Sequence, residues 1–426
     1  MTQKQNSTLP AIIVCILLFG MISFVTNLAS PMGKVLEAQF DVAPWMGKLG
    51  VLCNFIAYAI MGIPAGNLLQ KKGYKFTALT AVGVGFTGVA IQTLAGLLTG
   101  NAAFGVYLLG AFVAGFSMCM LNIVVNPMLN KLAGGGNRGN QLVQVGGSFN
   151  SLMGTATILL TGLLLGDIAA AKISQIFPLM FTALAIFAIA FAVVFFTKIP
   201  ENPNVGAKTV EEKSKYGPMS FRHFVLGAAA IFIYVGVEVG VPNLLNDWLL
   251  ASSVDSGIAG SVAATYWLLM LVGRLAGAAL GAKFSAKSML TAVSATGLVL
   301  VLGAIFLEPT TTMKFPVYAG ADGFITPELP INAILLVLCG LCTSVMWGGI
   351  FNLAVEGLGK YTEKGAGIFM AMVCGGGILP FLQGVVVTKT GGDYLASYWV
   401  IVAGLAFLLY YALVGSKNVN KNIPTE

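Results

Sequence analysis

Apolar segments of about twenty residues recur along this chain of 426 residues and are separated by polar loops. A helix needs about 20 apolar residues to cross ~30 Å of hydrocarbon. Inside a bilayer every backbone polar group must be satisfied within the spanning structure, so isolated segments of this length are expected to be helices. The sequence therefore predicts an all-α polytopic membrane protein with twelve spans, at 10–34, 45–70, 75–98, 103–130, 140–166, 174–197, 222–250, 256–282, 287–307, 330–356, 362–390 and 394–416.

The composition excludes several other classes of protein. Hydrophobic residues make up 57% of the chain and charged residues 9%, whereas soluble domains carry about 25% charged residues. The formal charge of +7 does not indicate a nucleic-acid partner, because the basic residues lie in loops between apolar segments. The sequence contains no nucleotide-binding loop, no nucleophile–His–acid set and no ligand spacing for a metal. We therefore expect neither an enzyme nor a bound cofactor.

The distribution of lysine and arginine predicts the orientation. Of the 23 basic residues, 17 lie on the side of the two termini, five lie on the other side, and Arg274 lies inside a span. Cytoplasmic loops carry the excess of positive charge, so both termini are predicted to be cytoplasmic. The polar interval 198–221 is expected to link a six-helix bundle at 1–197 to a second one at 222–426.

An internal repeat supports this division. The segment GIPAGNLLQKK at 62–72 and the segment GRLAGAALGAK at 273–283 share the pattern G-x-x-A-G-x-x-L-x-x-K at an offset of 211 residues. Each is expected to end at a cytoplasmic loop. Two six-helix halves with a cytoplasmic linker are typical of major facilitator transporters, whose substrate site lies between the halves near the middle of the bilayer.

One carboxylate stands out in the seventh predicted span. Glu238 lies near the middle of 222–250, where a charge costs at least ~2.5 kcal/mol and is by default a functional-site hypothesis. Four residues later Pro242, between Val241 and Asn243, is expected to kink or break the helix, as in transporters whose broken helices form binding sites. The alternative is that Glu238 only pairs with a neighbouring helix and stabilises the bundle.

Several segments resemble the fucose–galactose–glucose:cation symporter family. They are FVTNLASPMGKVLEAQF at 24–40, PAGNLLQKKGYK at 64–75, CMLNIVVNPMLNKL at 119–132, GGSFNSLMG at 146–154, FIYVGVEVGVPNLLNDWL at 232–249, LVGRLAG at 271–277 and CGGGILPFLQG at 374–384. The resemblance extends over essentially all twelve predicted spans. It implies a major facilitator fold and a sugar transporter.

The departures from the family pattern concern coupling. Where the family's fucose:proton symporter has an aspartate in helix one and a glutamate in helix four, this chain has Ser30 and Asn122. The same proton relay cannot operate unchanged, so Glu238 is our candidate coupling residue. Three schemes stay open: protonation of Glu238, a sodium site formed by Glu238 with Asn243 and Ser30, and transport without coupling. Burying an acid without a compensating partner at that depth costs free energy with no functional gain, which favours coupling by a proton or a sodium ion.

Sugar recognition requires amide and hydroxyl groups together with aromatic faces. The candidate substrate-binding residues, all within predicted spans, are Asn27, Asn122, Asn126, Gln144, Asn150, Asn243, Trp347 and Asn352. Asn122 and Asn126 are four residues apart and share a helix face. For any one of them the alternative is a hydrogen bond that only joins helices. Pro242 is assigned to gating, and Arg274 to structural pairing near an inner gate, with its long stem reaching toward the helix end.

Together these features predict a carrier that takes up a neutral hexose-type sugar across the inner membrane of a bacterium by alternating access. The expected partners are the sugar and the lipid bilayer, and a monomer is expected. The alternatives are an uncoupled sugar facilitator and a non-transporting sugar sensor on the same scaffold.

Overall fold

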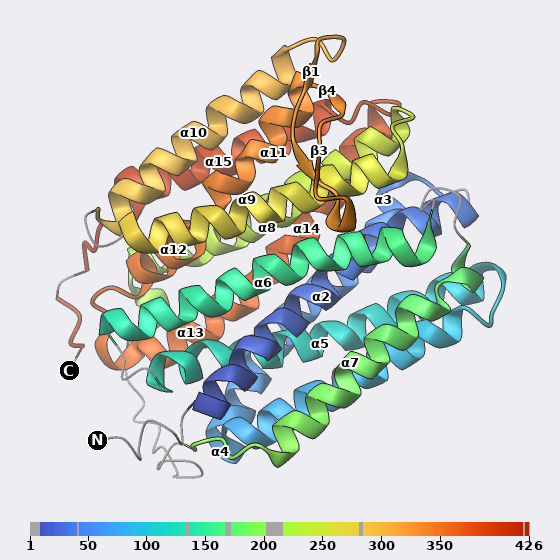
Figure 1. Ribbon diagram of the computed structural model, residues 1–426. Helices are drawn as coiled ribbons and strands as arrows, with labels where there is room; N and C mark the ends of the chain where they lie inside the picture. Colours follow the sequence, from blue (N-terminus) through green and yellow to red (C-terminus); the bar gives the residue numbers. More distant parts are fainter. Residues whose placement is uncertain are drawn as a thin grey trace.

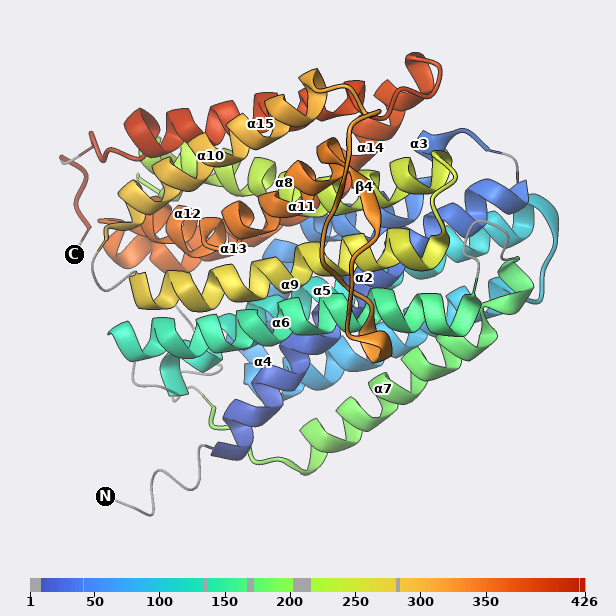
Figure 2. The same cartoon turned by 45° about the horizontal axis from the view of Figure 1, so that its top comes forward.

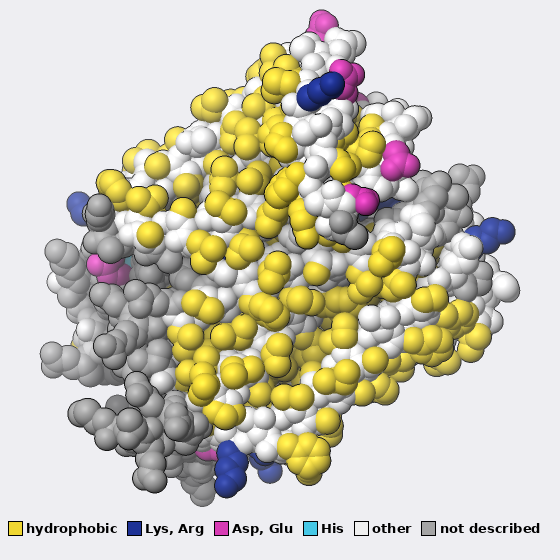
Figure 3. Space-filling view, viewed as in Figure 1, with side chains coloured by type: hydrophobic (Ala, Val, Ile, Leu, Met, Phe, Trp, Pro, Cys, Tyr) yellow, Lys and Arg dark blue, Asp and Glu magenta, His cyan; other side chains and the backbone are white. Residues whose placement is uncertain are grey.

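The computed structural model describes residues 9–40, 42–132, 136–166, 172–201, 216–280, 284–420 and 422–425. Within this part of the chain, 12 helices are long and apolar enough to cross a membrane. The prediction of an all-α protein with twelve spans is therefore confirmed. Figure 3 shows hydrophobic side chains over the flank of the molecule and charged side chains toward its ends, which is the distribution expected in a bilayer.

The first six spans are formed by five long helices. They are α2 (Leu9–Phe40), α4 (Leu49–Ala95), α5 (Gly100–Leu132), α6 (Gly136–Leu165) and α7 (Phe177–Phe196), with a short α3 (Pro44–Gly47) and the 3-10 turn η1 (Ile173–Gln175) between them. α4 contains two spans because its helical geometry is interrupted at Gly73, where φ is +84°. L-residues with a side chain rarely adopt such a φ, so glycine suits this junction.

The last six spans include three that are built from more than one element. α8 (Arg222–Ala251), α9 (Ser256–Leu280) and α10 (Ala286–Phe306) are single helices. Span ten is divided into α11 (Ile331–Thr343) and α12 (Met346–Val355). Span eleven consists of α13 (Thr362–Ala371), η5 (Met372–Cys374) and α14 (Gly375–Lys389), and span twelve of η6 (Ala396–Tyr398), α15 (Trp399–Tyr410) and the π-turn η7 (Tyr411–Gly415). The short turns η2 (Pro218–Ser220) and η4 (Gly359–Tyr361) lie in connections.

We expected Pro242 to kink or break its helix; the helix is not broken there, and a kink stays a prediction. α8 runs from Arg222 to Ala251 with Pro242 inside it. Proline lacks a backbone N–H, so the carbonyl of Glu238 loses its usual donor four residues on. Membrane helices tolerate such a proline where neighbouring groups satisfy the freed backbone. The interruptions occur in spans ten and eleven instead.

The spans run side by side along one direction. Figures 1 and 2 show that α2 begins and the last helix ends at the same end of the molecule; we call this the terminal end and its opposite the far end. This arrangement agrees with an even number of spans, while the side of the membrane on which the termini lie stays a prediction. The division into 1–197, 198–221 and 222–426 also stays a prediction, and residues 202–215 of the linker lie outside the described residues.

The connection between α10 and α11 forms a narrow β-hairpin. β1 (Thr312–Lys314) pairs with β4 (Glu328–Pro330), and β2 (Val317–Tyr318) pairs with β3 (Phe324–Ile325), around the turn η3 (Gly320–Asp322). The hairpin crosses α9 toward α6 (Figures 1 and 2). The backbone N–H of Tyr318 donates to Thr265 Oγ1 at 2.9 Å. A Cβ on Gly320 would lie 3.5 Å from Leu159 Cδ1, so the hairpin tip reaches a helix of the first six spans.

Candidate functional site

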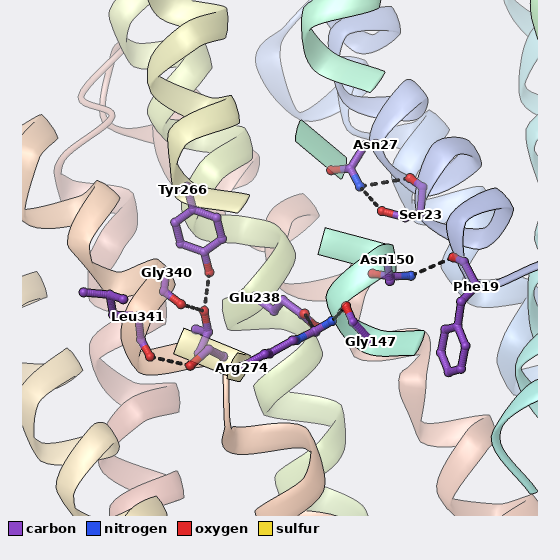
Figure 4. A network of polar contacts seen from close by, with 12 residues as sticks. Phe19, Ser23, Asn27, Gly147, Asn150, Glu238, Tyr266, Arg274, Gly340 and Leu341 are labelled. Atoms are coloured by element: carbon purple, nitrogen blue, oxygen red, sulfur yellow. Dashed lines mark hydrogen bonds and ion pairs between the residues drawn. The ribbon is translucent and has the colours of Figure 1, made fainter. Parts of the chain in front are cut away.

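Glu238 pairs with an arginine that also reaches a third helix. Arg274 Nη2 on α9 lies 3.2 Å from Glu238 Oε1 on α8. The other guanidinium nitrogen, Nη1, donates to the backbone carbonyl of Gly147 on α6. Glu238 is 9% exposed and Arg274 8%. Figure 4 shows the guanidinium between the Glu238 carboxylate and Gly147, so one cation joins two helices of the last six spans to one of the first six.

This geometry corrects one premise of the sequence reasoning. Glu238 is not uncompensated, because Arg274 neutralises it. Arg274 does not extend toward the helix end either; its head group lies inside the bundle. Removing one partner of a buried pair typically costs 3–5 kcal/mol, because the other charge is left unpaired. Arg274 therefore links α8, α9 and α6, and the loss of either partner would leave a buried charge unpaired.

α6 and α9 touch along more than this one contact. Thr155 Oγ1 on α6 donates to the carbonyl of Ala264 on α9 at 3.2 Å. A Cβ on Gly154 would lie 3.1 Å from the ring of Trp267 on α9, and 3.2 Å from both Asn27 Nδ2 and Ser23 Oγ on α2. Because Gly154 has no side chain, the Trp267 ring of α9 can lie close to the polar groups of Asn27 and Ser23 on α2.

Two of the candidate amides donate hydrogen bonds to groups on α2, and one of them, Asn27, belongs to α2 itself. Asn27 Nδ2 donates to the carbonyl of Ser23 at 2.9 Å and to Ser23 Oγ at 3.1 Å. Asn150 Nδ2 on α6 donates to the carbonyl of Phe19 at 3.1 Å. Figure 4 places both amides on the side of α6 and α2 that neighbours the Glu238–Arg274 pair. In this state their Nδ2 groups serve the protein's own backbone.

A second polar group lies between α4 and α5. Asn122 Nδ2 donates to Tyr58 Oη at 2.8 Å, and Asn126 Nδ2 donates to the carbonyl of Asn122 at 3.0 Å. The predicted shared face of Asn122 and Asn126 is therefore present. Tyr58, which is buried, was missed by the sequence reasoning because a tyrosine in an apolar segment resembles any other core aromatic residue.

The remaining candidates are not brought together. Asn243 is buried on α8, and Asn352 is exposed on α12. Trp347 packs edge-on against Tyr234 and Phe369, with ring centroids 6.3 Å and 6.1 Å apart. The side chains of the other two candidates, Ser30 and Gln144, lie outside the described part of the chain. Among the described residues no group of three or more His, Cys, Asp and Glu side chains could hold a metal ion.

The interruption of span ten lies next to this site. Tyr266 on α9 shares a hydrogen bond of 2.9 Å with Thr343 Oγ1 at the end of α11, and Ser344 Oγ donates to the carbonyl of Leu341 at 2.6 Å. Gly273 lets this segment approach α9 closely. Hydroxyl groups thus satisfy backbone carbonyls where the helix stops, as Figure 4 shows for Gly340 and Leu341.

A cluster of charges closes the far end, and sequence reasoning missed it. Asp247 on α8 forms ion pairs with Lys48, which precedes α4, and with Lys34 of α2 at 4.0 Å. Lys34 also binds Glu37 at 2.8 Å and donates to Tyr394 Oη at 3.3 Å. Burial raises the pKa of the Tyr394 phenol, against the opposing effect of Lys34, which keeps it a neutral acceptor. The signal available in the sequence was only that these charges lie at predicted span ends.

α3 adds an apolar contact to this closure. It packs against α14, where Trp45 and Phe381 meet edge-on with centroids 5.9 Å apart. A Cβ on Gly384 would lie 2.9 Å from the backbone of Trp45. The far end is therefore sealed by contacts between the first six and the last six spans.

Twelve spans with a polar, charge-bearing contact between the first six and the last six are typical of secondary transporters of the major facilitator type. The chain belongs to the major facilitator superfamily, whose family model matches residues 11–380. It is 28% identical to a glucose/galactose transporter of Brucella abortus over 98% of this chain and 97% of that protein. It is 22% identical to the L-fucose-proton symporter of Escherichia coli over 91% and 89%.

The solved structures agree with the fold. A crystal structure of the Escherichia coli fucose:proton symporter superposes with a TM-score of 0.71 at 20% identity, over 97% of this chain and 100% of that chain. The resemblance to the fucose–galactose–glucose:cation symporter family is thereby confirmed, as is the prediction that the protein belongs to a transporter family and not to an enzyme family.

Proposed function

We propose that this protein takes up a neutral hexose-type sugar by alternating access, coupled to a cation through Glu238. The sugar class is supported by relatives named as glucose/galactose and L-fucose-proton transporters. The observation that carries the coupling is the bridge from Glu238 through Arg274 to the carbonyl of Gly147. It makes the charge of one buried carboxylate part of the contact between α9 and α6.

A proton fits this site better than a sodium ion. A sodium ion bound at Glu238 would face a guanidinium that already lies 3.2 Å from the carboxylate, and like charges repel strongly in a low-dielectric interior. Protonation instead removes the negative charge from the pair. The guanidinium then needs other acceptors, because a buried charge without partners is costly. Sugar hydroxyl oxygens can serve as those acceptors, which would make proton and sugar binding interdependent.

The sugar contacts follow from the polar groups near the pair. Asn27, Asn150 and Asn122 are amides on α2, α6 and α5, and the Trp267 ring lies opposite Asn27 across Gly154. In an open state, amides that now bind backbone carbonyls could exchange them for sugar hydroxyls, which are ligands of the same hydrogen-bonding type. Gln144, Asn126, Asn243, Trp347 and Asn352 are retained as candidates on the sequence argument alone.

The setting is proposed on sequence grounds. We place the protein in the inner membrane of a bacterium as a monomer, with both termini and the 198–221 linker cytoplasmic, because basic residues are concentrated on that side. The relatives are bacterial proteins.

Uptake of labelled sugar into proteoliposomes tests the proposal. Glucose, galactose and fucose are each offered without a gradient, with an inward proton gradient and with an inward sodium gradient. We expect accumulation driven by the proton gradient and abolished by a protonophore. Accumulation that follows sodium would replace the proton as the coupling ion. Equilibration that ignores both gradients would support the uncoupled facilitator, and sugar binding without entry would support the sensor. Absence of both binding and entry for all three sugars would overturn the sugar class.

A further inference from the structure

A groove opens on the membrane-facing flank between α4 and α7, away from the site described above. It has a volume of about 320 Å³ and is lined by Val82, Gly83 and Phe86 of α4 and by Phe187, Ala188 and Phe191 of α7. Two small residues lie among four large ones, so the hollow forms at Gly83 and Ala188. A Cβ on Gly83 would find nothing within 4 Å. This groove is entirely apolar in its lining side chains.

The groove leads toward a group of lysines at the terminal end. Lys71, Lys72 and Lys75 lie at the start of the second span of α4, and Lys198 follows α7. Figure 3 shows Lys and Arg atoms at the end of this flank, next to its hydrophobic side chains. We call these four residues the lysine group. Lys71, Lys72 and Lys198 are exposed.

The lysine group is not neutralised within the described part of the chain. Its neighbouring carboxylate, Glu201, accepts hydrogen bonds from the backbone N–H groups of Tyr74 at 2.6 Å and Lys75 at 2.8 Å. No ion pair joins these lysines to a described Asp or Glu side chain. Lys75 Nζ instead donates to the carbonyls of Phe195 and Thr197 at the end of α7. Four positive charges against one negative charge leave an anion-attracting surface.

The depth of the groove matches that of an acyl chain. A helix rises 1.5 Å per residue, so Val82 and Phe86 lie ~10 and ~17 Å along α4 from Lys75. Phe191 and Phe187 lie ~8 and ~14 Å along α7 from its last residue, Phe196. The half-thickness of the hydrocarbon core is ~15 Å. The groove therefore occupies the leaflet whose head groups are level with the lysine group.

We propose that this flank binds one anionic glycerophospholipid, with its phosphate at the lysine group and one acyl chain in the groove between α4 and α7. Lys72 and Lys198 are exposed and can reach a phosphate, whereas Lys75 donates to two carbonyls at the end of α7. The charge selects an anionic head group, and the small side chains of Gly83 and Ala188 accept the chain. A zwitterionic lipid would use only the groove, and a second copy of this protein would use the apolar flank without the charge.

Two pairs of variants separate these contributions. Gly83→Leu places a leucine side chain in the groove, and its Cβ meets no atom within 4 Å. Gly162→Leu is the control, because a Cβ on Gly162 also finds nothing within 4 Å but lies on α6. Lys72→Gln with Lys198→Gln removes two charges while sparing Lys75. Lys314→Gln with Lys389→Gln removes two exposed charges elsewhere.

Native mass spectrometry of the full chain, titrated with phosphatidylglycerol and with phosphatidylethanolamine, measures the binding. We expect the wild type and both controls to prefer phosphatidylglycerol. The double lysine variant should bind it about 30-fold more weakly, which corresponds to ~1 kcal/mol per lysine. Gly83→Leu should lose the bound lipid while keeping the melting temperature of Gly162→Leu.

Equal binding of the two lipids by the wild type would overturn the proposal, as would unchanged phosphatidylglycerol binding in Gly83→Leu. A dimer mass that disappears in Gly83→Leu would identify a second copy as the occupant and would also overturn it.

Discussion

Asp247 on α8 lies between two lysines that come from the first six spans. Lys48 and Asp247 are each 1% exposed, and Lys34 lies 4.0 Å from the second carboxylate oxygen. A buried pair is held together only while both charges are present, because an unpaired charge in a low-dielectric interior is not solvated. At the scale of single residues, the far-end closure and the Glu238–Arg274 bridge therefore follow the same rule.

Asp247→Asn is expected to destabilise the protein by roughly 3–5 kcal/mol, because Lys48 is left buried without its carboxylate. The measurement is the melting temperature of the purified protein in detergent. Asp322→Asn, at an exposed acid of the hairpin, is the matched control and should leave the melting temperature unchanged. A melting temperature for Asp247→Asn equal to that of the control would contradict a structural role for the cluster.

The positions of the spans could be predicted from the sequence, because a segment of about twenty apolar residues crosses a bilayer as an α-helix. The interruptions could not. Ser344 and Val345 separate α11 from α12, yet neither is a glycine or proline. The contacts at this interruption come from Tyr266 and Gly273 on α9, which is far from it in the sequence. Conversely, Pro242 was expected to kink or break its helix, and α8 is not broken there. Tertiary contacts accompany the interruption of span ten, and these cannot be read from the sequence.

At the scale of elements, glycines set how closely helices approach. A Cβ on Gly375 would lie 1.8 Å from the carbonyl oxygen of Phe232, where α14 packs on α8. Gly375→Ala must therefore push two backbones apart and should destabilise the protein by roughly 1–3 kcal/mol, as overpacking does. Gly367→Ala on α13 meets nothing within 4 Å and should be neutral or slightly stabilising. Thermal unfolding of the two variants side by side checks this, and equal melting temperatures would contradict the packing account.

The candidate site residues stay predictions. Glu238 was selected because an acid near the middle of an apolar span is conspicuous, and Asn27, Asn122 and Asn150 were selected as amides within spans. Pairing with a neighbouring helix was the stated alternative for Glu238, and structural pairing was expected for Arg274. The sequence did not identify the two residues as each other's partners, because they are 36 positions apart and belong to different helices. The hydrogen bond from Arg274 to the carbonyl of Gly147 could not be predicted either, since every residue has a backbone carbonyl.

At the scale of the whole molecule, contacts between the first six and the last six spans occur at two levels. The Asp247 cluster and α3 close the far end, and the Arg274–Gly147 contact joins α9 to α6 deeper in the bundle. Alternating access requires the far-end contacts to open while others form. A proton on Glu238 would act on the deeper contact, so the proposed coupling lies where the two sets of spans meet.

The most direct test compares two transport modes of the Glu238→Gln variant in proteoliposomes. The amide mimics a permanently protonated carboxylate, so the carrier should still exchange labelled for unlabelled sugar across the membrane at equal concentrations. It should no longer accumulate sugar when an inward proton gradient is imposed, because residue 238 can no longer take up and release a proton. Gradient-driven accumulation by Glu238→Gln at the wild-type level would contradict the assignment of coupling to Glu238.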